Sequence, residues 1–250
     1  MKKLLIALAL VTMGVATVSA QKARLMSYNI HNCVGIDGVK SIKRIAEVVK
    51  KFSPDVVALQ EVDSMTRRNK KHLTEEIAKL SGYHGYFMRT VPHTGGGYGI
   101  AMLSKQPALS VTKIPLPCRS EPRGFLLVEF DKYYYACTHL SLHKEDRAAS
   151  VEIIREVLSK LDKPVFIAGD LNARPQSSEM LAFKEFVTVL NNENQYTFNA
   201  QNPQLCIDYI LCYGATATTL KSFVDYDNLA SDHLPLYVDV KFKPIKKGKK

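Results

Sequence analysis

Short apolar runs bounded by acids, amides or histidines recur along this chain, and they restrict its fold more than any other feature of the sequence. Residues 55–61, DVVALQE, and residues 164–170, PVFIAGD, have the length and continuous hydrophobicity of buried strands. The other strand-like runs lie at residues 24–30, 98–104, 110–116, 124–130, 133–140, 206–212 and 234–242. Apolar residues recur at helical spacing in residues 40–52, 72–81 and 144–161. The sequence therefore combines many strands with a few helices.

The order of these elements favours two packed sheets with helices outside them. Runs of adjacent strands interleaved with helices do not fit a barrel in which strand and helix alternate strictly. The chain has 250 residues, of which 46% are hydrophobic, and this is enough for one sizeable core. No internal repeat or linker-like segment divides the sequence. We therefore predict one α/β (α+β) domain over residues 21–243.

The first twenty residues are typical of a secretory signal peptide. Lys2 and Lys3 precede the apolar stretch LLIALALVTMGVA, and small residues lead to a cleavage site between Ala20 and Gln21. The alternative is a membrane anchor, but the apolar run is shorter than the roughly 20 residues that span a bilayer. The sequence thus predicts an exported protein, periplasmic or extracellular, and residues 244–250 are expected to form a basic disordered tail.

The net charge of +10 comes mostly from the two ends of the sequence. Two lysines fall in the first twenty residues and six in the last ten, which leaves 26 basic and 24 acidic side chains between them. The folded body is therefore nearly neutral, at +2. The five cysteines form no C-x-x-C motif, and Cys206 and Cys212 would lie roughly 20 Å apart along one strand. We expect buried thiols rather than a zinc or redox site.

Side chains able to do chemistry stand where the predicted strands begin or end. They are Asn29, Glu61, His139, Asp170, Asn172, Asp208, Asp232 and His233. Strand ends and loops on a rigid frame are the usual positions of catalytic groups. The sequence has no G-x-S-x-G, no P-loop and no H-E-x-x-H motif, so acyl hydrolase, P-loop NTPase and zincin activities lack support. What remains is a site of carboxylates and imidazoles for a hard metal ion.

Seven segments in order resemble the endonuclease/exonuclease/phosphatase superfamily of metal-dependent phosphoesterases. They are SYNIH (27–31), LQEVD (59–63), YGIAMLSK (98–105), THL (138–140), GDLNARP (169–175), IDYIL (207–211) and SDHLPL (231–236). The resemblance covers essentially all of the chain after the signal peptide. It implies a four-layer α/β/β/α sandwich, in which helices flank two mixed β-sheets, and this agrees with the elements predicted above.

The resemblance also implies a role for each matching residue near a metal ion. Glu61 corresponds to the main Mg²⁺ ligand, and a single carboxylate suits Mg²⁺ because this ion keeps several waters. Asn29 corresponds to a residue that contacts the metal or a phosphate oxygen, and Asp232 to a second acid near the metal. The expected cofactor is therefore Mg²⁺, with Mn²⁺ as the alternative.

The remaining matching residues are implied to act on the phosphate and on water. Asp170 would position or deprotonate the attacking water, while Asn172 and His139 would bind the phosphate. Asp208 and His233 would form a carboxylate–imidazole pair, in which the carboxylate fixes the tautomer of the ring. Whether the histidine or Asp170 is the base stays open at this point.

Several other residues have weaker assignments. Arg123 stands before a strand, where it either faces the site and binds phosphate or only bounds the strand. His31, His72, His84, His93 and His143 are expected at the surface or in turns. His93 belongs to a glycine-rich loop, VPHTGGGYG, that could flank the substrate but is not followed by a helix.

The sequence therefore predicts an exported, Mg²⁺-dependent phosphoric ester hydrolase. A small soluble ester is the favoured substrate, because a neutral body suits nucleic acid poorly and a chain without Trp suits a membrane interface poorly. The alternatives are a secreted nuclease, a sphingomyelinase-like phospholipase C that acts on a lipid headgroup, and a catalytically silent binding module on the same fold. No obligate protein partner is evident.

Overall fold

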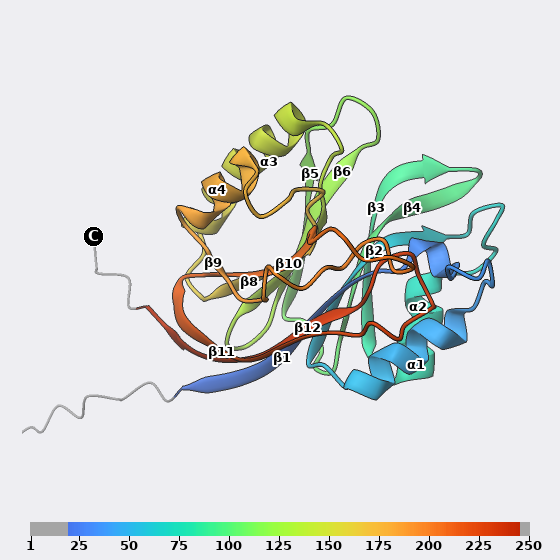
Figure 1. Cartoon of the computed structure of the whole chain (residues 1–250), viewed down its shortest axis with the longest axis horizontal. Helices are drawn as coiled ribbons and strands as arrows, with labels where there is room; N and C mark the ends of the chain where they lie inside the picture. Colours follow the sequence, from blue (N-terminus) through green and yellow to red (C-terminus); the bar gives the residue numbers. More distant parts are fainter. Residues whose placement is uncertain (1–19, 246–250) are drawn as a thin grey trace, which may run out of the picture.

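The computed structural model describes residues 20–245, which form two six-stranded sheets with helices on their outer faces (Figure 1). The first sheet has the order β11-β12-β1-β2-β4-β3. Its strands are β1 (Gln21–Asn29), β2 (Val56–Ser64), β3 (His84–His93), β4 (Gly96–Ser104), β11 (Ala215–Val224) and β12 (Leu236–Pro244). The second has the order β5-β6-β7-β8-β10-β9. Its strands are β5 (Ser110–Leu116), β6 (Arg123–Glu129), β7 (Tyr134–His139), β8 (Val165–Asp170), β9 (Thr188–Val189) and β10 (Asp208–Tyr213).

The helices complete a four-layer sandwich, as the sequence predicts. In Figure 1, α1 (Ile42–Phe52) and α2 (Leu73–Ser81) lie beside the first sheet, while α3 (Lys144–Ser159) and α4 (Ser178–Lys184) lie against the second. Each helix pair shares a hydrophobic cluster with its own sheet. Both sheets are mixed, because β1 and β2 run parallel, as do β7 and β8, within otherwise antiparallel sheets.

Local sequence signals explain where the predicted helices begin and end. The side chain of Ser41 accepts a hydrogen bond from the backbone NH of Arg44 and caps the start of α1. Gly82, with a φ of 80°, ends α2 in the left-handed conformation that favours glycine. The predicted ranges 40–52 and 72–81 are confirmed to within two residues, and α3 ends two residues before the predicted boundary at residue 161.

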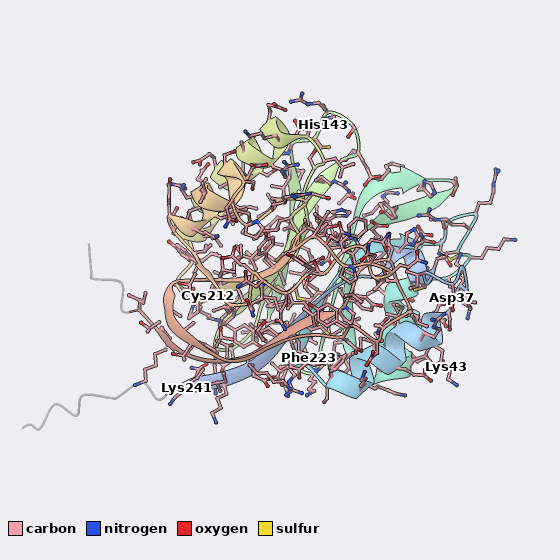
Figure 2. The ribbon with its side chains drawn as sticks, viewed as in Figure 1. Asp37, Lys43, His143, Cys212, Phe223 and Lys241 are labelled. Atoms are coloured by element: carbon pink, nitrogen blue, oxygen red, sulfur yellow. The ribbon has the colours of Figure 1, made fainter. Side chains whose placement is uncertain are left out.

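The inner faces of the two sheets meet over an aromatic core. Phe166 of β8 and Phe242 of β12 pack edge to face with ring centroids 4.9 Å apart, and Tyr133 contacts both rings. The buried hydroxyl of Tyr135 donates to the carbonyl of Met26, which links β7 to β1 across the sandwich. Side chains fill the space between the sheets, whereas Lys43 extends from the outer face of α1 (Figure 2). Both sheets are therefore held by one continuous interior.

The glycine-rich segment 91–99 is a hairpin rather than a loop. It joins β3 to β4, and neither β3, β11 nor α4 was expected from the sequence pattern. A Cβ atom on Gly99 would lie 2.1 Å from the carbonyl oxygen of Met88 in β3, and one on Gly96 would lie 2.2 Å from that of Ser64 in β2. These glycines therefore permit close approach between strands, and the expected loop is a hairpin whose Tyr98 and Gly99 line one pocket with Arg123 and His139.

The carboxyl end of the domain also differs from the expected boundary at residue 243. β12 includes Pro244, which pairs with Ala215, and the backbone NH of Ile245 donates to the carbonyl of Gly214. The strand therefore runs past the point where a tail was expected to begin. The signal peptide expected at residues 1–20, except Ala20, and residues 246–250 of the tail lie outside the described residues. Within residues 20–245, no helix is long and apolar enough to span a membrane.

Replacing Phe166 by Ala should lower the free energy of unfolding by about 3–5 kcal/mol, because the change opens a cavity between the sheets. Leu220→Ala is the control: Leu220 lies on β11 with 53% of its surface exposed, so its loss should change stability by less than about 0.5 kcal/mol. Denaturant unfolding followed by circular dichroism measures both values. Equal effects of the two substitutions would contradict the assignment of Phe166 to the core.

Candidate active site

The predicted site residues converge where the carboxyl ends of two parallel strand pairs face each other. Asn29 ends β1 beside β2, and in the second sheet His139 at the end of β7 pairs with Asp170 at the end of β8. The amide nitrogen of Asn29 lies 3.2 Å from Asp170 Oδ2. The site therefore spans the seam between the two sheets.

Asn29 is the residue that connects the two halves of this site. Its Nδ2 donates to Glu61 Oε1 at 3.0 Å and to Asp170 Oδ2, and it lies 3.4 Å from His233 Nε2. Its Oδ1 accepts a hydrogen bond from the backbone NH of His31 at 3.1 Å. In this arrangement Asn29 acts as a donor that fixes two carboxylates.

Glu61 reaches the site because β2 carries an irregularity at this position. The pairing of β2 with β4 shifts register between Leu59 and Val62, and Glu61 has a left-handed φ of 59°. Such a bulge redirects a side chain that regular alternation would point elsewhere. Glu61 is half-buried, between Gln60 and Val62, which are both fully buried. The backbone therefore turns one carboxylate out of the core and toward the seam.

His233 and Asp208 form the carboxylate–imidazole pair that the sequence predicts. His233 Nδ1 lies 2.9 Å from Asp208 Oδ2, and both side chains are buried. Burial alone would lower the pKa of His233, but the nearby carboxylates of Asp208, Asp170 and Asp232 outweigh it and raise the pKa to about 10. His233 therefore carries a positive charge at neutral pH, beside the carboxylates of Asp208 and Asp170.

Asp170 occupies the centre of the cluster. Its Oδ2 lies 3.5 Å from His233 Nε2 and 3.4 Å from His139 Nε2, and its Oδ1 accepts a hydrogen bond from the backbone NH of Asn172 at 2.9 Å. Burial raises the pKa of Asp170 to about 7, with Asp208 adding to the rise and His233 opposing it. Because His233 is already protonated, Asp170 is the better candidate for the group that orients a water molecule.

His139 and Arg123 form the part of the site suited to phosphate. Burial, Arg123 and His233 all lower the pKa of His139 well below its usual value, so this ring is neutral. Arg123 Nη1 lies 3.5 Å from His139 Nδ1, and an arginine only donates, so the ring proton belongs on Nε2 and points to Asp170. Arg123 also pairs with Glu121, while its buried Nε has no hydrogen-bond partner within residues 20–245. Arg123 thus faces the site rather than only bounding its strand.

Asn172 and Asp232 lie at the edge of the cluster. Asn172 has a left-handed φ of 49°, and its Nδ2 donates to the carbonyl of Leu140 at 3.0 Å. The conformation of its own backbone and this hydrogen bond together fix the position of the side chain. Asp232 is half-buried, and its Oδ1 lies 3.8 Å from His31 Nδ1. His31 is in a turn, as expected, but that turn lies at the site. The structure therefore brings together all the predicted residues.

Three further residues support the site, and two of them, Thr197 and Phe198, carry no signal in the sequence. The hydroxyl of Thr197 accepts from the backbone NH of Asp208 at 3.3 Å, and Ser231 donates to the carbonyl of Asn29 at 2.7 Å. The ring of Phe198 packs on the ring of His233 with centroids 4.6 Å apart. Thr197 and Phe198 belong to the irregular segment between β9 and β10, where no apolar period or motif marks them.

Comparison with known proteins identifies the family of this chain. A sequence profile of the Endonuclease/Exonuclease/phosphatase family matches residues 26–233, which contain every residue of the cluster described above. The chain therefore belongs to this family, and it is a hydrolase that acts on phosphoester bonds. A search of curated proteins gives no significant match.

Solved structures share the fold over most of the chain. An endonuclease/exonuclease/phosphatase from Beutenbergia cavernae DSM 12333 is 26% identical, with a TM-score of 0.75, and the match covers 88% of this chain and 71% of that one. A mannosyl-6-phosphatase from Bacteroides thetaiotaomicron VPI-5482 is 18% identical, with a TM-score of 0.69 and coverage of 87% and 99%. The human Nocturnin catalytic domain with bound sulfate is 21% identical, with a TM-score of 0.67 and coverage of 90% and 98%.

Enzymes of this family typically use divalent metals, and the residues present fit a hard one. Glu61 and Asp232 offer carboxylate oxygens, the donors that Mg²⁺ and Mn²⁺ prefer. The thiol of Cys137 lies behind the site against Leu59, but burial raises its pKa to about 12, so it supplies no thiolate. A bound metal would polarise the phosphoryl oxygen.

A second cluster of possible ligands, two aspartates and a histidine, is less suited to a metal ion. Ligand atoms of Asp170, Asp208 and His233 all lie within 4.8 Å of one another. His233 Nδ1 lies 2.9 Å from Asp208 Oδ2, however, so in this arrangement two of the three groups are hydrogen-bonded to each other. The metal ligands that the sequence resemblance implies are Glu61, Asn29 and Asp232.

Asp208→Asn and His233→Ala should each lower kcat by about 10²–10⁴, because the loss of either residue removes the positive charge held at the seam. The double mutant should lose little more than the worse single mutant, since the two residues act as a unit. Steady-state kinetics on a chromogenic phosphoester measures this, with thermal unfolding as the control for folding. Multiplicative losses would show that the residues act independently.

Proposed function

We propose that this protein is an exported, Mg²⁺- or Mn²⁺-dependent phosphoric ester hydrolase that acts on small soluble phosphoesters. The observation that carries the proposal is the division of the seam into two chemically different sides. Glu61 and Asp232 supply oxygen ligands, whereas Arg123 supplies donors for phosphate oxygens, including a buried Nε without a partner among the described residues, and neutral His139 positions Arg123 by accepting at Nδ1.

Each residue then has a distinct task in hydrolysis. Arg123, His139 and Asn172 hold the phosphate, and Asp170 orients the water that attacks phosphorus. His233, held by Asp208, supplies fixed positive charge where negative charge develops in the transition state. A bound metal ion would supply Lewis acidity at the phosphoryl oxygen. These groups act on the phosphate that monoesters and diesters share, so they do not select one over the other.

The charge of the body supports a small substrate. Outside the two ends, basic side chains exceed acidic ones by only two, so the protein has little excess charge for neutralising a polynucleotide. The similarity in fold to a mannosyl-6-phosphatase, of which the match covers 99%, also favours a small ester.

A nuclease is the second candidate, and one observation favours it. The segment RRNKK at residues 67–71 follows β2, the strand that carries Glu61. Two of its four charges are already paired within the protein, Arg68 with Asp63 and Lys71 with Glu76. Only Arg67 and Lys70 remain for an external anion, which is few for a nucleic-acid interface.

Activity should disappear after exhaustive dialysis against EDTA and return with Mg²⁺ or Mn²⁺ but not with Zn²⁺, because the ligands are hard oxygens. Glu61→Gln should raise the metal concentration needed for half-maximal activity. The measurement uses p-nitrophenyl phosphate and bis-p-nitrophenyl phosphate, with plasmid DNA, RNA and sphingomyelin assayed in parallel. Full activity after dialysis would overturn the metal requirement, and faster turnover of nucleic acid would overturn the substrate.

Export rests on the amino-terminal sequence alone. If residues 1–20 are a cleaved signal peptide, the full-length chain expressed in a bacterium with a Sec pathway should yield a mature protein that begins at Gln21. Intact-mass measurement of the protein from the periplasm or medium tests this. The control is a variant with Leu8 and Leu10 changed to Arg, which should stay unprocessed in the cytoplasm. A mature mass that includes residues 1–20 would contradict export by cleavage.

A further inference from the structure

A pocket with a volume of about 470 Å³ is lined mainly by the segment between β9 and β10. Phe198 and Leu205 are its apolar lining residues, and Arg174 also lines it. Phe198 packs directly on the ring of His233, and Arg174 follows Asn172 by two residues. The pocket is therefore connected to the proposed phosphate site through Phe198, which contacts His233, and through Arg174, which follows Asn172.

The segment that forms this pocket is hydrogen-bonded to the segment before β12 that carries His233. The backbone NH of Ala200 donates to the carbonyl of Asp232 at 2.7 Å, and that of Leu234 donates to the carbonyl of Thr197 at 2.8 Å. Phe198 also forms a β-bridge with His233. The wall of the pocket and the histidine thus form one rigid unit, and a group bound in the pocket has a fixed position relative to the phosphate.

Internal hydrogen bonds shape the same segment into a tight turn. Phe198 and Leu205 exchange backbone hydrogen bonds at 3.1 and 2.8 Å, and the NH of Asn202 donates to the carbonyl of Asn199 at 3.0 Å. Oδ1 of Asn199 accepts from the NH of Gln201 at 3.0 Å. The backbone is satisfied within the turn, so side-chain amides remain for a ligand.

Polar side chains without partners in the protein surround the apolar floor. The amides of Asn202 and Gln204 and the guanidinium of Arg174 line the pocket, and none of them hydrogen-bonds to another described residue. An amide both donates and accepts, and an arginine donates through five N–H groups. An aromatic floor bordered by such groups suits a ring or chain that has C–H faces and hydroxyl edges.

The charge of the pocket narrows the class of ligand further. Among the residues that line it, Arg174 is the only charged one, and no carboxylate is present. A cationic head group such as choline would be repelled by Arg174 and would find no acid to pair with. An aliphatic chain would leave the amides facing hydrocarbon without hydrogen bonds.

We infer that this pocket binds the alcohol part of the ester, and that the alcohol is a polyhydroxylated group of the size of a monosaccharide. This inference rests on the proposed phosphoesterase function and deepens it by naming the substrate class. Asn202, Gln204 and Arg174 then determine specificity through hydrogen bonds to hydroxyl groups, and Phe198 supports the carbon face of the ring.

The test compares three phosphomonoesters that differ only in the alcohol. Glucose 6-phosphate offers hydroxyl groups, n-butyl phosphate offers none, and p-nitrophenyl phosphate has a good leaving group that needs little binding. The variants are Asn202→Ala, Gln204→Ala, their double mutant and Arg174→Gln. Asn194→Ala, an exposed amide outside the pocket, is the matched control. Thermal unfolding confirms that each variant folds.

Wild-type protein should hydrolyse glucose 6-phosphate with at least tenfold higher kcat/KM than n-butyl phosphate. The double mutant should lose roughly tenfold on glucose 6-phosphate, the sum of two hydrogen bonds, and less than about twofold on p-nitrophenyl phosphate. The Asn194→Ala control should change neither value. Equal losses on both esters, or no loss on either, would overturn the inference.

Two further outcomes separate this inference from the proposed function. Hydrolysis of p-nitrophenyl phosphate without preference for the sugar ester over n-butyl phosphate would overturn the inference and leave the proposed function standing. If the metal-loaded protein hydrolyses bis-p-nitrophenyl phosphate but none of the three monoesters, the inference is overturned and the proposed function stands; if it hydrolyses none of the four, both are overturned. Loss of activity with all esters in Asp208→Asn, but not in the pocket variants, would confirm that the pocket acts on the alcohol and not on the chemical step.

Discussion

The hydrogen bond between His233 and Asp208 holds the two sheets in register at the place where chemistry occurs. His233 stands just before β12 in the first sheet, whereas Asp208 begins β10 in the second. Neither charge would be stable alone at this depth, because a buried carboxylate or imidazolium loses its hydration. The segment before β12 in the first sheet therefore carries the positive charge of the pair, and the second sheet carries the negative one. The hydrogen bond from Asn29 to Asp170 crosses the same seam. The site exists only when both sheets have docked.

Backbone geometry that ordinary residues avoid surrounds this charge pair. His31, Asn32 and Cys33 form a left-handed turn, and Glu61 also has a positive φ. Residues other than glycine adopt a positive φ only at a cost in free energy, which the surrounding structure must offset. The buried carboxylate of Asp63 accepts hydrogen bonds from Thr66, Arg68 and Asn69, and Asn69 in turn donates to the carbonyl of Asn32. One buried acid thus ties the segment after Glu61 to the turn after Asn29.

Strong periodicity and strand-end motifs allowed most of the fold and all of the cluster to be predicted. The spacing of apolar residues predicts α1 and α2, and Gly82 marks the end of α2. The site residues are indicated by their position after buried strands. The pattern failed at β3 and β11, which are exposed along much of their length, so no face of either strand is uniformly apolar. It also failed at Thr197 and Phe198, whose roles arise from tertiary hydrogen bonds and ring contact. Such contacts join residues distant in sequence and leave no local period.

The thiols described above divide into two kinds, with a practical consequence for spectroscopy. Cys33, Cys137, Cys206 and Cys212 are buried, and burial raises the pKa of each to about 12. Cys118 is half-exposed in the turn before β6; the little burial it has would raise its pKa, but its hydrogen bonds with Ser141 and Ser120 lower the pKa overall. A maleimide or nitroxide reagent at neutral pH therefore meets one reactive sulfur in the native chain. That sulfur lies five residues before Arg123, so a single label on the unmutated protein would stand close to the phosphate side of the seam.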